Sequence, residues 1–497
     1  MNAASPMKLK ELVAGMQPLK VEGPVDRDIT GIVYDSRRVT PGAMFVAIRG
    51  AQHDGHAFID AAIERGAAAI LCEQNGFHAR KATRVKVADT RAALAEVAAK
   101  FHGEPSARLK VIGVTGTNGK TTVTFMLKRI LETAGLKTGL IGTVRYEIGE
   151  RVIPAHRTTP ESLETQQMLA SMVRDHCRAC VMEVSSHALD QHRVRGVHFD
   201  TAIFTNLTQD HLDYHGTMED YFAAKQRLFT PEYLGNKSGS AVINIDDQYG
   251  QRLAADSAPT VTFSYGVCQA ARLRAVDIRL GAAETRFTIE WEGRRLECAL
   301  PLIGRHNIYN ALAAFGAALA LKIEPAQITS ALAAMPPVPG RLERVDAGQP
   351  FNVFVDYAHT DDALRNVLTA LREVTGGRLL LLFGCGGNRD TGKRAKMGRV
   401  AAELADHTLI TTDNPRKESP EAIAAQIEQG FTAVRRDGFG MELDRQRAIE
   451  TVLRMARPGD TVLLAGKGHE TYQEFENTVV PFDDREHARE ALERQRR

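Results

Sequence analysis

Residues 113–122, "GVTGTNGKTT", set three glycines and a lysine between two stretches of different hydrophobic period. Before them, "LKVIGV" (109–114) is a short, β-branched apolar run typical of a buried strand. After them, apolar residues recur at helical spacing up to a plausible stop at Gly135; they are Val123, Met126, Leu127, Ile130, Leu131 and Ala134. The stretch therefore predicts a strand, a glycine-rich loop and a helix in direct succession.

This loop has the chemistry of a phosphate site. Free backbone N–H groups and the dipole at a helix N-terminus favour an anion. We expect Lys120 to bridge the β- and γ-phosphates of a nucleotide and Thr121 to offer a hydroxyl to Mg²⁺. The strict phosphate-loop pattern is not met, because Val114 stands where a glycine is required. The alternative is a plain glycine-rich turn with a surface lysine, but Gly-Lys-Thr-Thr in this context favours nucleotide binding.

Bulk properties exclude several classes of protein. A chain of 497 residues suggests about three domains, and 43% hydrophobic with 25% charged residues is typical of a soluble globular protein. A net charge of +2 gives no reason to expect nucleic acid or an anionic membrane as a partner. No apolar run approaches the roughly 18 residues of a membrane span, and we expect a cytoplasmic protein with reduced cysteines. The CxxC at Cys177 and Cys180 has no second pair to complete a zinc site.

Two seams containing proline and glycine divide the chain. They are "FHGEPSARLK" (101–110) and "AAMPPVPGRLE" (333–343), and they predict domains at 1–106, 107–336 and 337–497. Strands alternating with helices predict an α/β fold with parallel sheets. The central domain also contains an antiparallel stretch, "TRFTIEWEGRRLECAL" (285–300), with a turn at Glu292 and Gly293.

Polar residues follow the predicted strands, where ligands bind in such sheets. They are Glu183, Asn206, Asp210, His211, Asp213, His215, Asp356, His359, Asn388, Arg389, Asp413, Asn414, Arg416, Lys467, His469 and Glu470. Glu183 is placed to hold Mg²⁺, and the cluster at 206–215 favours a metal and substrate site.

Three features stay open from residue type alone. Composition predicts that Lys225 is a surface lysine. His306, Asn307 and Asn310 form either a capped helix start or a contact to a nucleotide base. Asn-Pro at 414–415 is compatible with a simple turn.

The motifs together resemble the Mur ligase family in order and spacing. They are "TGTNGKTT", "RTTPES", "MEVSSHAL", "TNLTQDHLDYHG", "YFAAKQRLF", "GRHNIYN", "PGRLE", "VDYAHT" and "DNPR", and they cover nearly the whole chain. The resemblance is closest to members that add diaminopimelate, and the family's own form of the phosphate loop explains the missing glycine.

The resemblance implies a three-domain ligase of peptidoglycan precursor synthesis. It implies an N-terminal uridine-nucleotide-binding domain, a central phosphate-loop ATPase domain with a parallel sheet and a small antiparallel sheet, and a Rossmann-like C-terminal domain. ATP would phosphorylate a carboxylate of UDP-N-acetylmuramoyl-L-alanyl-D-glutamate, and an amine of meso-diaminopimelate would attack the acyl phosphate. The implied enzyme acts as a monomer.

The resemblance also assigns site residues. It places the triphosphate on Gly116, Thr117, Asn118, Gly119, Lys120, Thr121 and Thr122, and adenosine near Asn307, Asn310, Arg341 and Asp356. Mg²⁺ would lie near Thr121, Glu183 and His211, with a second ion on a carbamate of Lys225. The uridine end would meet Ser36, Gln52 and His53, and the muramyl dipeptide Thr158, Thr159, Ser185, Gln191 and Arg193. The incoming amino acid would meet Arg389, Asp413, Asn414, Pro415, Arg416, Gly466 and Glu470.

Other functions compete with this assignment. A lysine-adding relative and folylpolyglutamate synthetase would use the same machinery. A kinase would not need a third domain with clustered polar loops, and a nucleotide-driven switch would release phosphate without any amino acid.

Overall fold

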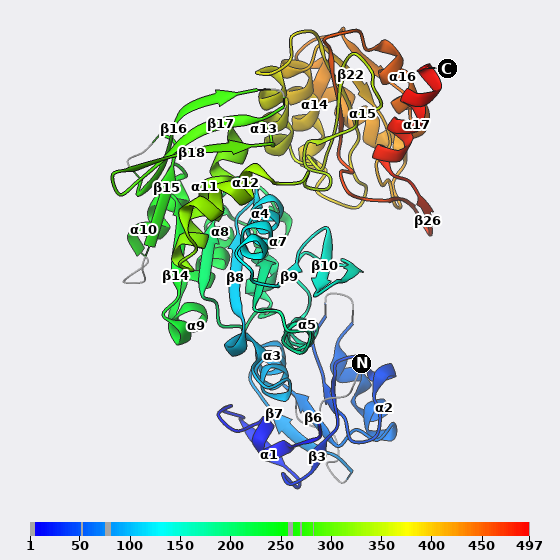
Figure 1. Cartoon of the computed structure of the whole chain (residues 1–497). Coiled ribbons are helices and arrows are strands. Elements are labelled where there is room, and N and C mark those ends of the chain that lie inside the picture. Colours follow the sequence, from blue (N-terminus) through cyan, green and yellow to red (C-terminus); the bar gives the residue numbers. More distant parts are fainter. Residues whose placement is uncertain are drawn as a thin grey trace.

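The computed structural model describes residues 5–50, 53–74, 81–256, 262–268, 271–281 and 283–496. Three α/β lobes follow one another along the chain, with the central lobe between the N-terminal lobe and the C-terminal lobe (Figure 1). The three-domain α/β fold is thereby confirmed. The limits at 106 and 336 stay a prediction. Among the described residues, no helix is long and apolar enough to cross a membrane.

The N-terminal lobe is built on a five-stranded sheet in the order β2-β7-β6-β5-β4. These strands are β2 (Lys20–Glu22), β4 (Ile32–Val33), β5 (Met44–Val46), β6 (Ala69–Cys72) and β7 (Thr83–Lys86). Strands β1 (Met7–Lys8) and β3 (Asp28–Ile29) pair separately. The helices are α1 (Leu9–Leu12), α2 (Ile59–Glu64) and α3 (Thr90–Phe101), with 3₁₀ turns η1 (Ser36–Arg38), η2 (Gly55–Phe58) and η3 (Pro105–Arg108). Arg91 of α3 reaches Glu161 of the central lobe at 3.2 Å, which joins the two lobes.

The central lobe holds an eleven-stranded sheet in the order β11-β10-β9-β12-β8-β13-β14-β15-β16-β17-β18. The bounds are β8 (Lys110–Thr115), β9 (Thr138–Ile141), β10 (Arg145–Ile148), β11 (Arg151–Pro154), β12 (Ala179–Glu183), β13 (Thr201–Phe204), β14 (Ser240–Asn244), β15 (Thr262–Gly266), β16 (Leu273–Leu280), β17 (Thr285–Trp291) and β18 (Arg294–Leu300). The strands from β9 to β16 in this order run parallel, and the strands at both ends are antiparallel. The expected antiparallel strands therefore extend the parallel sheet. The turn at Glu292 and Gly293 is confirmed, with φ of 48° and 74°.

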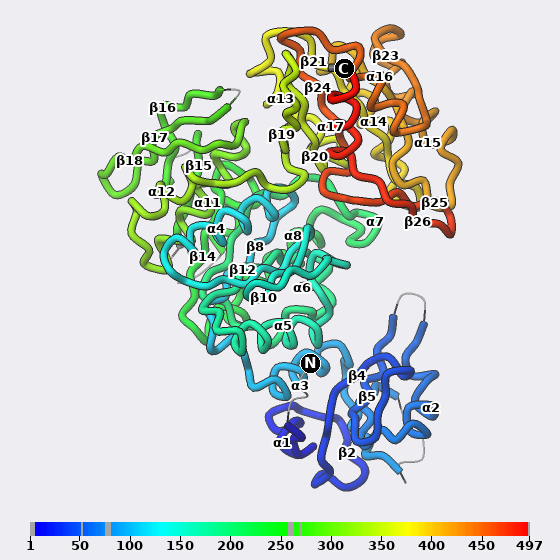
Figure 2. Tube along the Cα trace, turned by 45° about the vertical axis from the view of Figure 1, so that its right-hand side comes forward, coloured from blue at the N-terminus to red at the C-terminus, as the bar shows by residue number. Residues whose placement is uncertain are grey.

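Helices cover this sheet on both faces (Figures 1 and 2). They are α4 (Lys120–Thr133), α5 (Ser162–Arg174), α6 (Ser186–Asp190), α7 (Leu212–His215), α8 (Met218–Gln226), α9 (Pro231–Leu234), α10 (Gln248–Asp256), α11 (Arg305–Ala320) and α12 (Pro325–Ala333), with η4 (Arg227–Phe229) and η5 (Gly235–Lys237). The predicted apolar stripe of α4 is buried: Val123, Leu127 and Ile130 pack with Val114 of β8 and Ile308 of α11 in one core. Burial of each such side chain stabilises the fold by about 1.5–3 kcal/mol, which anchors the loop that joins β8 to α4.

The C-terminal lobe has a six-stranded sheet in the order β19-β20-β24-β21-β22-β23. The strands are β19 (Glu343–Arg344), β20 (Asn352–Asp356), β21 (Leu379–Phe383), β22 (His407–Ile410), β23 (Phe439–Met441) and β24 (Thr461–Ala465). All but β19 are parallel, as the alternation with helices predicts. The helices are α13 (Asp361–Arg372), α14 (Gly392–Leu404), α15 (Pro420–Thr432), α16 (Arg445–Met455) and α17 (Asp484–Arg496). A separate hairpin, β25 (Tyr472–Phe475) with β26 (Thr478–Pro481), was not expected from the sequence.

Candidate functional site

The loop 116–122 follows β8 at the point where the order of strands reverses, with β12 on one side of β8 and β13 on the other. Gly116 and Gly119 have φ of 145° and 87°, which side-chain-bearing residues rarely adopt. A Cβ on Gly116 would collide with the hydroxyl of Thr205, and one on Gly119 with the side-chain oxygen of Asn310. Glycine is therefore required at both positions by conformation and by space.

Lys120 begins α4 and its ammonium folds back over the loop. Its Nζ donates to the carbonyls of Gly116 (3.0 Å) and Thr117 (2.9 Å). Burial lowers the pKa of Lys120, and the carboxylates of Glu183 and Asp210 oppose this shift. The side chain thus stands among the loop carbonyls, beside where a phosphate anion would bind.

Glu183 ends β12 and is buried directly beside α4. Its carboxylate accepts hydrogen bonds from the Thr121 hydroxyl (3.0 Å), the Thr143 backbone N–H (2.8 Å) and the Thr143 hydroxyl (3.0 Å). A carboxylate and two hydroxyls are hard oxygen donors of the kind that Mg²⁺ prefers. In the part of the chain that the structure describes, no three His, Cys, Asp or Glu side chains gather closely enough to hold a metal alone. A cation here would complete its coordination with nucleotide oxygens.

Lys225 lies inside the protein, on α8. Its side chain is 1% exposed, and its Nζ donates to the Gly116 carbonyl at 2.9 Å and lies 4.5 Å from the ring centroid of Tyr221. Composition predicted a surface lysine, and that prediction is wrong. Burial, and then the charge of Lys120, hold the pKa of Lys225 well below its usual value.

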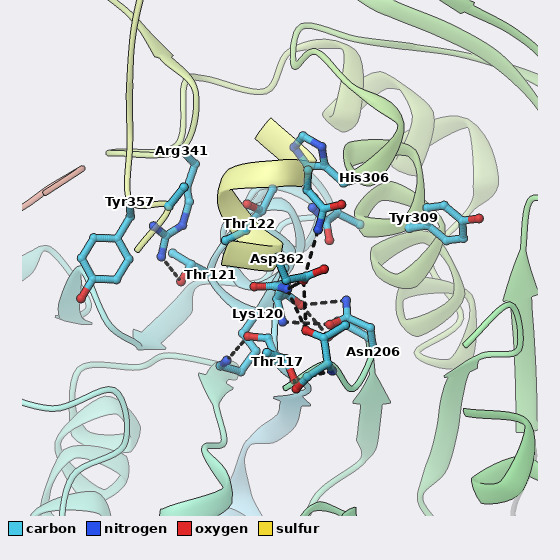
Figure 3. A pocket seen from close by; sticks show the side chains of 18 of the residues that line it. Thr117, Lys120, Thr121, Thr122, Asn206, His306, Tyr309, Arg341, Tyr357 and Asp362 are labelled. Carbon is cyan, nitrogen blue, oxygen red and sulfur yellow. Dashed lines mark hydrogen bonds between the residues drawn. The ribbon is translucent and has the colours of Figure 1, made fainter. Parts of the chain in front are cut away.

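A first cavity of about 630 Å³ opens above the loop, between the central and C-terminal lobes (Figure 3). Its lining includes Thr117, Asn118, Gly119, Lys120, Thr121, Thr122, Glu183, Asn307, Asn310, Arg341 and Asp356. Helix α11 begins at Arg305 after Gly304, without a side-chain cap, so the capped-start alternative for this stretch is wrong. The Asn310 amide instead donates to Asn307 Oδ1 at 3.0 Å.

Asp356 and Arg341 enter the first cavity from the C-terminal lobe. Both Asp356 carboxylate oxygens accept backbone N–H groups, from Leu342 (2.7 Å) and Ala358 (2.8 Å). Burial raises the pKa of Asp356, and the Arg341 guanidinium opposes the shift. Arg341 donates to the Thr121 hydroxyl at 3.2 Å, so the two lobes meet at the loop itself (Figure 3).

A second cavity of about 800 Å³ adjoins the first. The predicted residues in its lining are Thr158, Asp210, His211, Asp213, His359, Arg389, Asp413, Asn414, Arg416, Gly466, His469 and Glu470. Both cavities are lined by Thr143, Thr158, Asp210, His211, Tyr357, His359 and Thr360. The loop above β8 and the polar loops of the C-terminal sheet therefore face one continuous space.

His211 lies on the boundary of the two cavities. It precedes α7 with φ of 54°, and its ring centroid lies 4.8 Å from that of His187. Burial lowers the pKa of His211 to about 4, so the imidazole is neutral at pH 7. A neutral imidazole is the form that binds a metal ion.

Arg416 is fixed by the unexpected hairpin. The Arg416 backbone N–H donates to the Glu474 carbonyl of β25 (3.0 Å), and its Nε to the Glu474 carboxylate (2.7 Å). Nη1 donates to the Gly387 carbonyl at 2.8 Å, and the residue adopts φ of 53°. The 413–416 stretch is therefore more than a simple turn, because Glu474 of strand β25 holds Arg416 at the lining of the second cavity.

Several predicted residues lie outside both linings. Thr159 is buried, its hydroxyl donates to the Glu183 carbonyl (2.8 Å), and it accepts a bond from Arg193 (3.2 Å) at its own carbonyl. Arg193 also donates to Gln191 (2.7 Å). These contacts hold the backbone at Glu183 in place. The other predicted residues outside the linings are Ser36, His53, Gly116, Ser185, His215, Lys225, Asn388, Pro415 and Lys467, and Gln52 lies outside the described residues.

Two residues that the sequence did not indicate take part in the site: Thr143 binds Glu183, and Asp362 accepts a hydrogen bond of 2.7 Å from Asn118. Lys467, which was expected to follow a strand, is completely buried beside Asp413, Asn414 and Glu470. Nothing in the local sequence around Thr143 or Asp362 distinguishes them from ordinary loop and helix residues.

Comparison with known proteins gives matches along most of the chain. Family models match residues 28–102 (Mur ligase family, catalytic domain), 114–318 (Mur ligase middle domain) and 340–468 (Mur ligase, glutamate ligase domain). A protein of Syntrophomonas wolfei named UDP-N-acetylmuramoyl-L-alanyl-D-glutamate–2,6-diaminopimelate ligase is 45% identical over 98% of this chain and 99% of its own. A Clostridium acetobutylicum protein of the same name, numbered 1, is 43% identical over 97% of this chain and 98% of its own. A solved structure of a protein so named superposes with a TM-score of 0.72 at 31% identity, covering 99% of this chain and all of the other.

Proposed function

This chain belongs to the Mur ligase family, and we propose that it joins meso-2,6-diaminopimelate to UDP-N-acetylmuramoyl-L-alanyl-D-glutamate in peptidoglycan precursor synthesis. The reaction converts ATP to ADP and phosphate. Relatives of this name match it at 42–45% identity over almost the whole chain. We also propose that the enzyme is cytoplasmic and monomeric. A sedimentation measurement would test whether it is a monomer.

The continuity of the two cavities carries this proposal. A ligase of this type must pass an activated carboxylate from the nucleotide to an amine without losing it to water. The first cavity contains the glycine-rich loop with Lys120, and the second contains Arg416 and Asn414. His211 and Thr158 line both, so the reacting carboxylate would lie near them, between the two substrates.

In the first cavity, we assign the triphosphate to residues 116–122 and adenosine to Asn307, Asn310, Arg341 and Asp356. Lys120 would neutralise charge on the transferring phosphoryl group, and loop N–H groups would bind the phosphates. Because Arg341 comes from the C-terminal lobe and reaches Thr121, its charge enters the site only when the two lobes are together.

The oxygen donors around Glu183 fit Mg²⁺. We propose that Thr121, Glu183 and His211 would hold it against the nucleotide, where the ion supplies charge neutralisation for phosphoryl transfer. Lys225 has a buried amine of low pKa, and the neutral amine is the form that reacts with CO₂. We propose a carbamate on Lys225, whose negative charge would offset the nearby Lys120 ammonium and attract a second ion.

The reaction balances in two steps. The γ-phosphoryl group of ATP passes to a carboxylate oxygen and ADP leaves, which converts a poor leaving group into a good one. The amine nitrogen then attacks the carbonyl carbon, a C–N bond forms, the C–O bond to phosphate breaks, and the nitrogen loses a proton. The contribution of the protein is to position the reactants and to neutralise charge.

We assign each part of the two substrates to the side chains that lie nearest to where it would bind. Thr158 lines both cavities and would meet the muramyl dipeptide, supported by Thr159, Ser185, Gln191 and Arg193. Ser36, Gln52 and His53 of the N-terminal lobe would meet the uridine end. In the second cavity, the carboxylates of diaminopimelate would be bound by Arg389, Arg416 and Asn414. An ammonium of the same substrate would be bound by Asp413 and Glu470. Pro415 and Gly466 would fix the conformation of the loops that carry these side chains.

One assay tests the activity. Purified protein is incubated with ATP, Mg²⁺ and UDP-N-acetylmuramoyl-L-alanyl-D-glutamate, and either meso-diaminopimelate or L-lysine is added. We expect phosphate release and a product of tripeptide mass with meso-diaminopimelate. Equal catalytic efficiency with L-lysine would indicate the lysine-adding activity, and phosphate release that needs no amino acid would indicate a nucleotide-driven switch.

A further inference from the structure

Lys467 is a charged side chain that the reaction described above does not use. It follows β24, its side chain is 0% exposed, and its Nζ donates to Asn414 Oδ1 (3.1 Å) and to Glu470 Oε2 (3.2 Å). The same Nζ lies 3.5 Å from Asp413 Oδ1. Burying an unpaired ammonium is strongly unfavourable, so the position of Lys467 depends on these carboxylates.

The charges around Lys467 do not cancel. Asp413 and Glu470 carry two negative charges and Lys467 one positive charge. Arg445 is close by, but its Nε and Nη2 are committed to Asp484, at 2.7 and 2.6 Å. Within this buried group of three side chains, one negative formal charge therefore remains in excess.

The excess charge has an identifiable location. Asp413 Oδ1 is buried and has no hydrogen-bond partner among the described residues; its ion-pair partner is the Lys467 ammonium at 3.5 Å, and Asp413 lines the second cavity. This carboxylate shares its single cation with Glu470 and Asn414, so its charge is incompletely compensated. A cationic N–H donor entering the second cavity would give the Asp413 carboxylate a second partner.

Asn414 is oriented by the same lysine. Its Oδ1 accepts from Lys467 Nζ and from the Glu474 backbone N–H (both 3.1 Å), so its Nδ2 faces Glu470 and donates to it at 2.8 Å. Because Glu474 also binds Arg416, Lys467 belongs to one connected network with the arginine of this cavity.

We propose that Lys467 is a positioning residue of the amino-acid subsite: it cancels one of two negative charges, holds Asn414 and Glu470, and leaves Asp413 to bind the ammonium of the incoming diamino acid. This inference rests on the proposed function, because it takes the second cavity as the site of diaminopimelate. A site with one excess negative charge suits a single ammonium group, and a second ammonium would remain uncompensated there.

Titration of Glu470 provides a readout of this role. Burial and then Asp413 raise the pKa of Glu470, whereas Lys467 and Asn414 lower it. Glu470 also interacts electrostatically with three other ionisable groups, those of Tyr357, Tyr472 and Arg445. Loss of Lys467 raises the pKa of Glu470 further, so acidification would weaken diaminopimelate binding at a higher pH than in the wild type.

The test compares Lys467→Met with Lys417→Met, which replaces an exposed lysine on the neighbouring loop. In Lys467→Met we expect the KM for meso-diaminopimelate to rise about tenfold or more. The KM values for ATP and for the UDP-linked substrate should stay within about twofold, since the first cavity is unchanged. The acid limb of kcat/KM for diaminopimelate should move to higher pH, whereas Lys417→Met should match the wild type throughout.

A double variant separates charge balance from packing. Glu470→Gln alone leaves Lys467 to neutralise Asp413, so it should also raise the KM for diaminopimelate. Adding Lys467→Met to Glu470→Gln restores one excess negative charge, and the double variant should bind diaminopimelate better than Glu470→Gln. This comparison remains usable if Lys467→Met alone does not fold, because the double variant buries no unpaired charge on Glu470.

The outcomes are distinct. Wild-type protein that does not ligate diaminopimelate would refute the proposed function. Ligation by the wild type, with an unchanged diaminopimelate KM and pH profile in Lys467→Met, would refute the role of Lys467 alone. Effects that simply multiply in the double variant would likewise assign Lys467 to packing rather than to charge balance.

Discussion

The Asp362 carboxylate accepts a hydrogen bond of 2.7 Å from the side-chain amide of Asn118, across the boundary between the C-terminal and central lobes. The same oxygen accepts from the Thr208 hydroxyl at 3.0 Å. Helix α13, which begins one residue earlier, is thereby tied to the glycine-rich loop and to the segment after β13. With Arg341 bound to Thr121, the contact couples the position of a whole lobe to the loop.

We expect Asp362→Ala to loosen this boundary. Loss of a charged acceptor removes hydrogen bonds worth roughly 1.5–3 kcal/mol in total. Amide hydrogen exchange over residues 116–120 and 205–210 should become faster in the variant. Glu373→Ala, at the exposed far end of α13, should leave the exchange rates unchanged. Identical protection in Asp362→Ala and the wild type would show that the contact contributes nothing to lobe closure.

Glu183→Gln tests the carboxylate next to the loop. The substitution preserves side-chain size but removes the negative charge of the carboxylate that accepts hydrogen bonds from Thr121 and Thr143. We expect kcat to fall by about 10²–10³, and the Mg²⁺ concentration needed for half-maximal rate to rise. Phosphate release over a Mg²⁺ titration measures both. Glu132→Gln, an exposed change on α4, serves as the control, and a Glu183→Gln enzyme with its Mg²⁺ dependence unaltered would contradict the assignment.

Lys225 is expected to carry a carbamate, and the modification can be observed directly. After equilibration with ¹³C-bicarbonate, the wild type should give a carbamate carbon signal that Lys225→Ala lacks and that Lys81→Ala retains. Acidification below the lowered pKa of Lys225 protonates the amine, so the signal and the ligase activity should decline together. A Lys225→Ala enzyme that keeps full activity would refute the role of this lysine.

Arg416 is expected to select the amino acid. Meso-diaminopimelate carries one more carboxylate than lysine, and a guanidinium held by Glu474 can bind it through parallel hydrogen bonds. Arg416→Ala should raise the KM for diaminopimelate by about 10²-fold with a smaller change in kcat, and reduce the preference over L-lysine. Glu474→Gln should have a weaker effect in the same direction. Catalytic efficiencies with both amino acids measure this, and a preference that survives Arg416→Ala would place selectivity elsewhere.

Arg445 and Asp484 form a completely buried ion pair, with both side chains 0% exposed. Arg445 also donates to the carbonyls of Thr412 and Ala465, which directly precede Asp413 and Gly466. Asp484→Ala leaves a buried guanidinium unpaired and should cost about 3–5 kcal/mol of stability. Calorimetry should show a lower Tm for the C-terminal lobe, and the exposed control Asp444→Ala a much smaller change. An unaltered Tm in Asp484→Ala would contradict this account.

Local sequence was sufficient to predict most elements of the fold. Strand β8, the loop at 116–119 and helix α4 follow from a change of hydrophobic period within about 25 residues, and β22 and β24 lie just before Asp413 and Lys467, which were expected to follow strands. These signals are reliable because each depends on neighbours along the chain. The hairpin β25–β26 was missed because it packs against the loop that carries Arg416, and its residues show little alternation of their own.

The site was predictable as a set of motifs, and the resemblance to a family assigned roles that residue types alone left open. Lys225 shows the limit of prediction from residue type. A lysine on a short helix looks like a surface residue in the sequence, and only tertiary packing places this one inside the protein, next to Gly116. The pairing of Asp362 with Asn118 depends on segments of two lobes, and the burial of Lys467 beside Asn414 depends on two loops of the C-terminal lobe that lie 53 positions apart. Sequence thus determined the strand–loop–helix unit and the order of polar loops, because these arise from local periodicity and turn chemistry. Only the tertiary structure decided which charges face one another, because packing brings together separate loops of one lobe and, between Asn118 and Asp362, residues 244 positions apart.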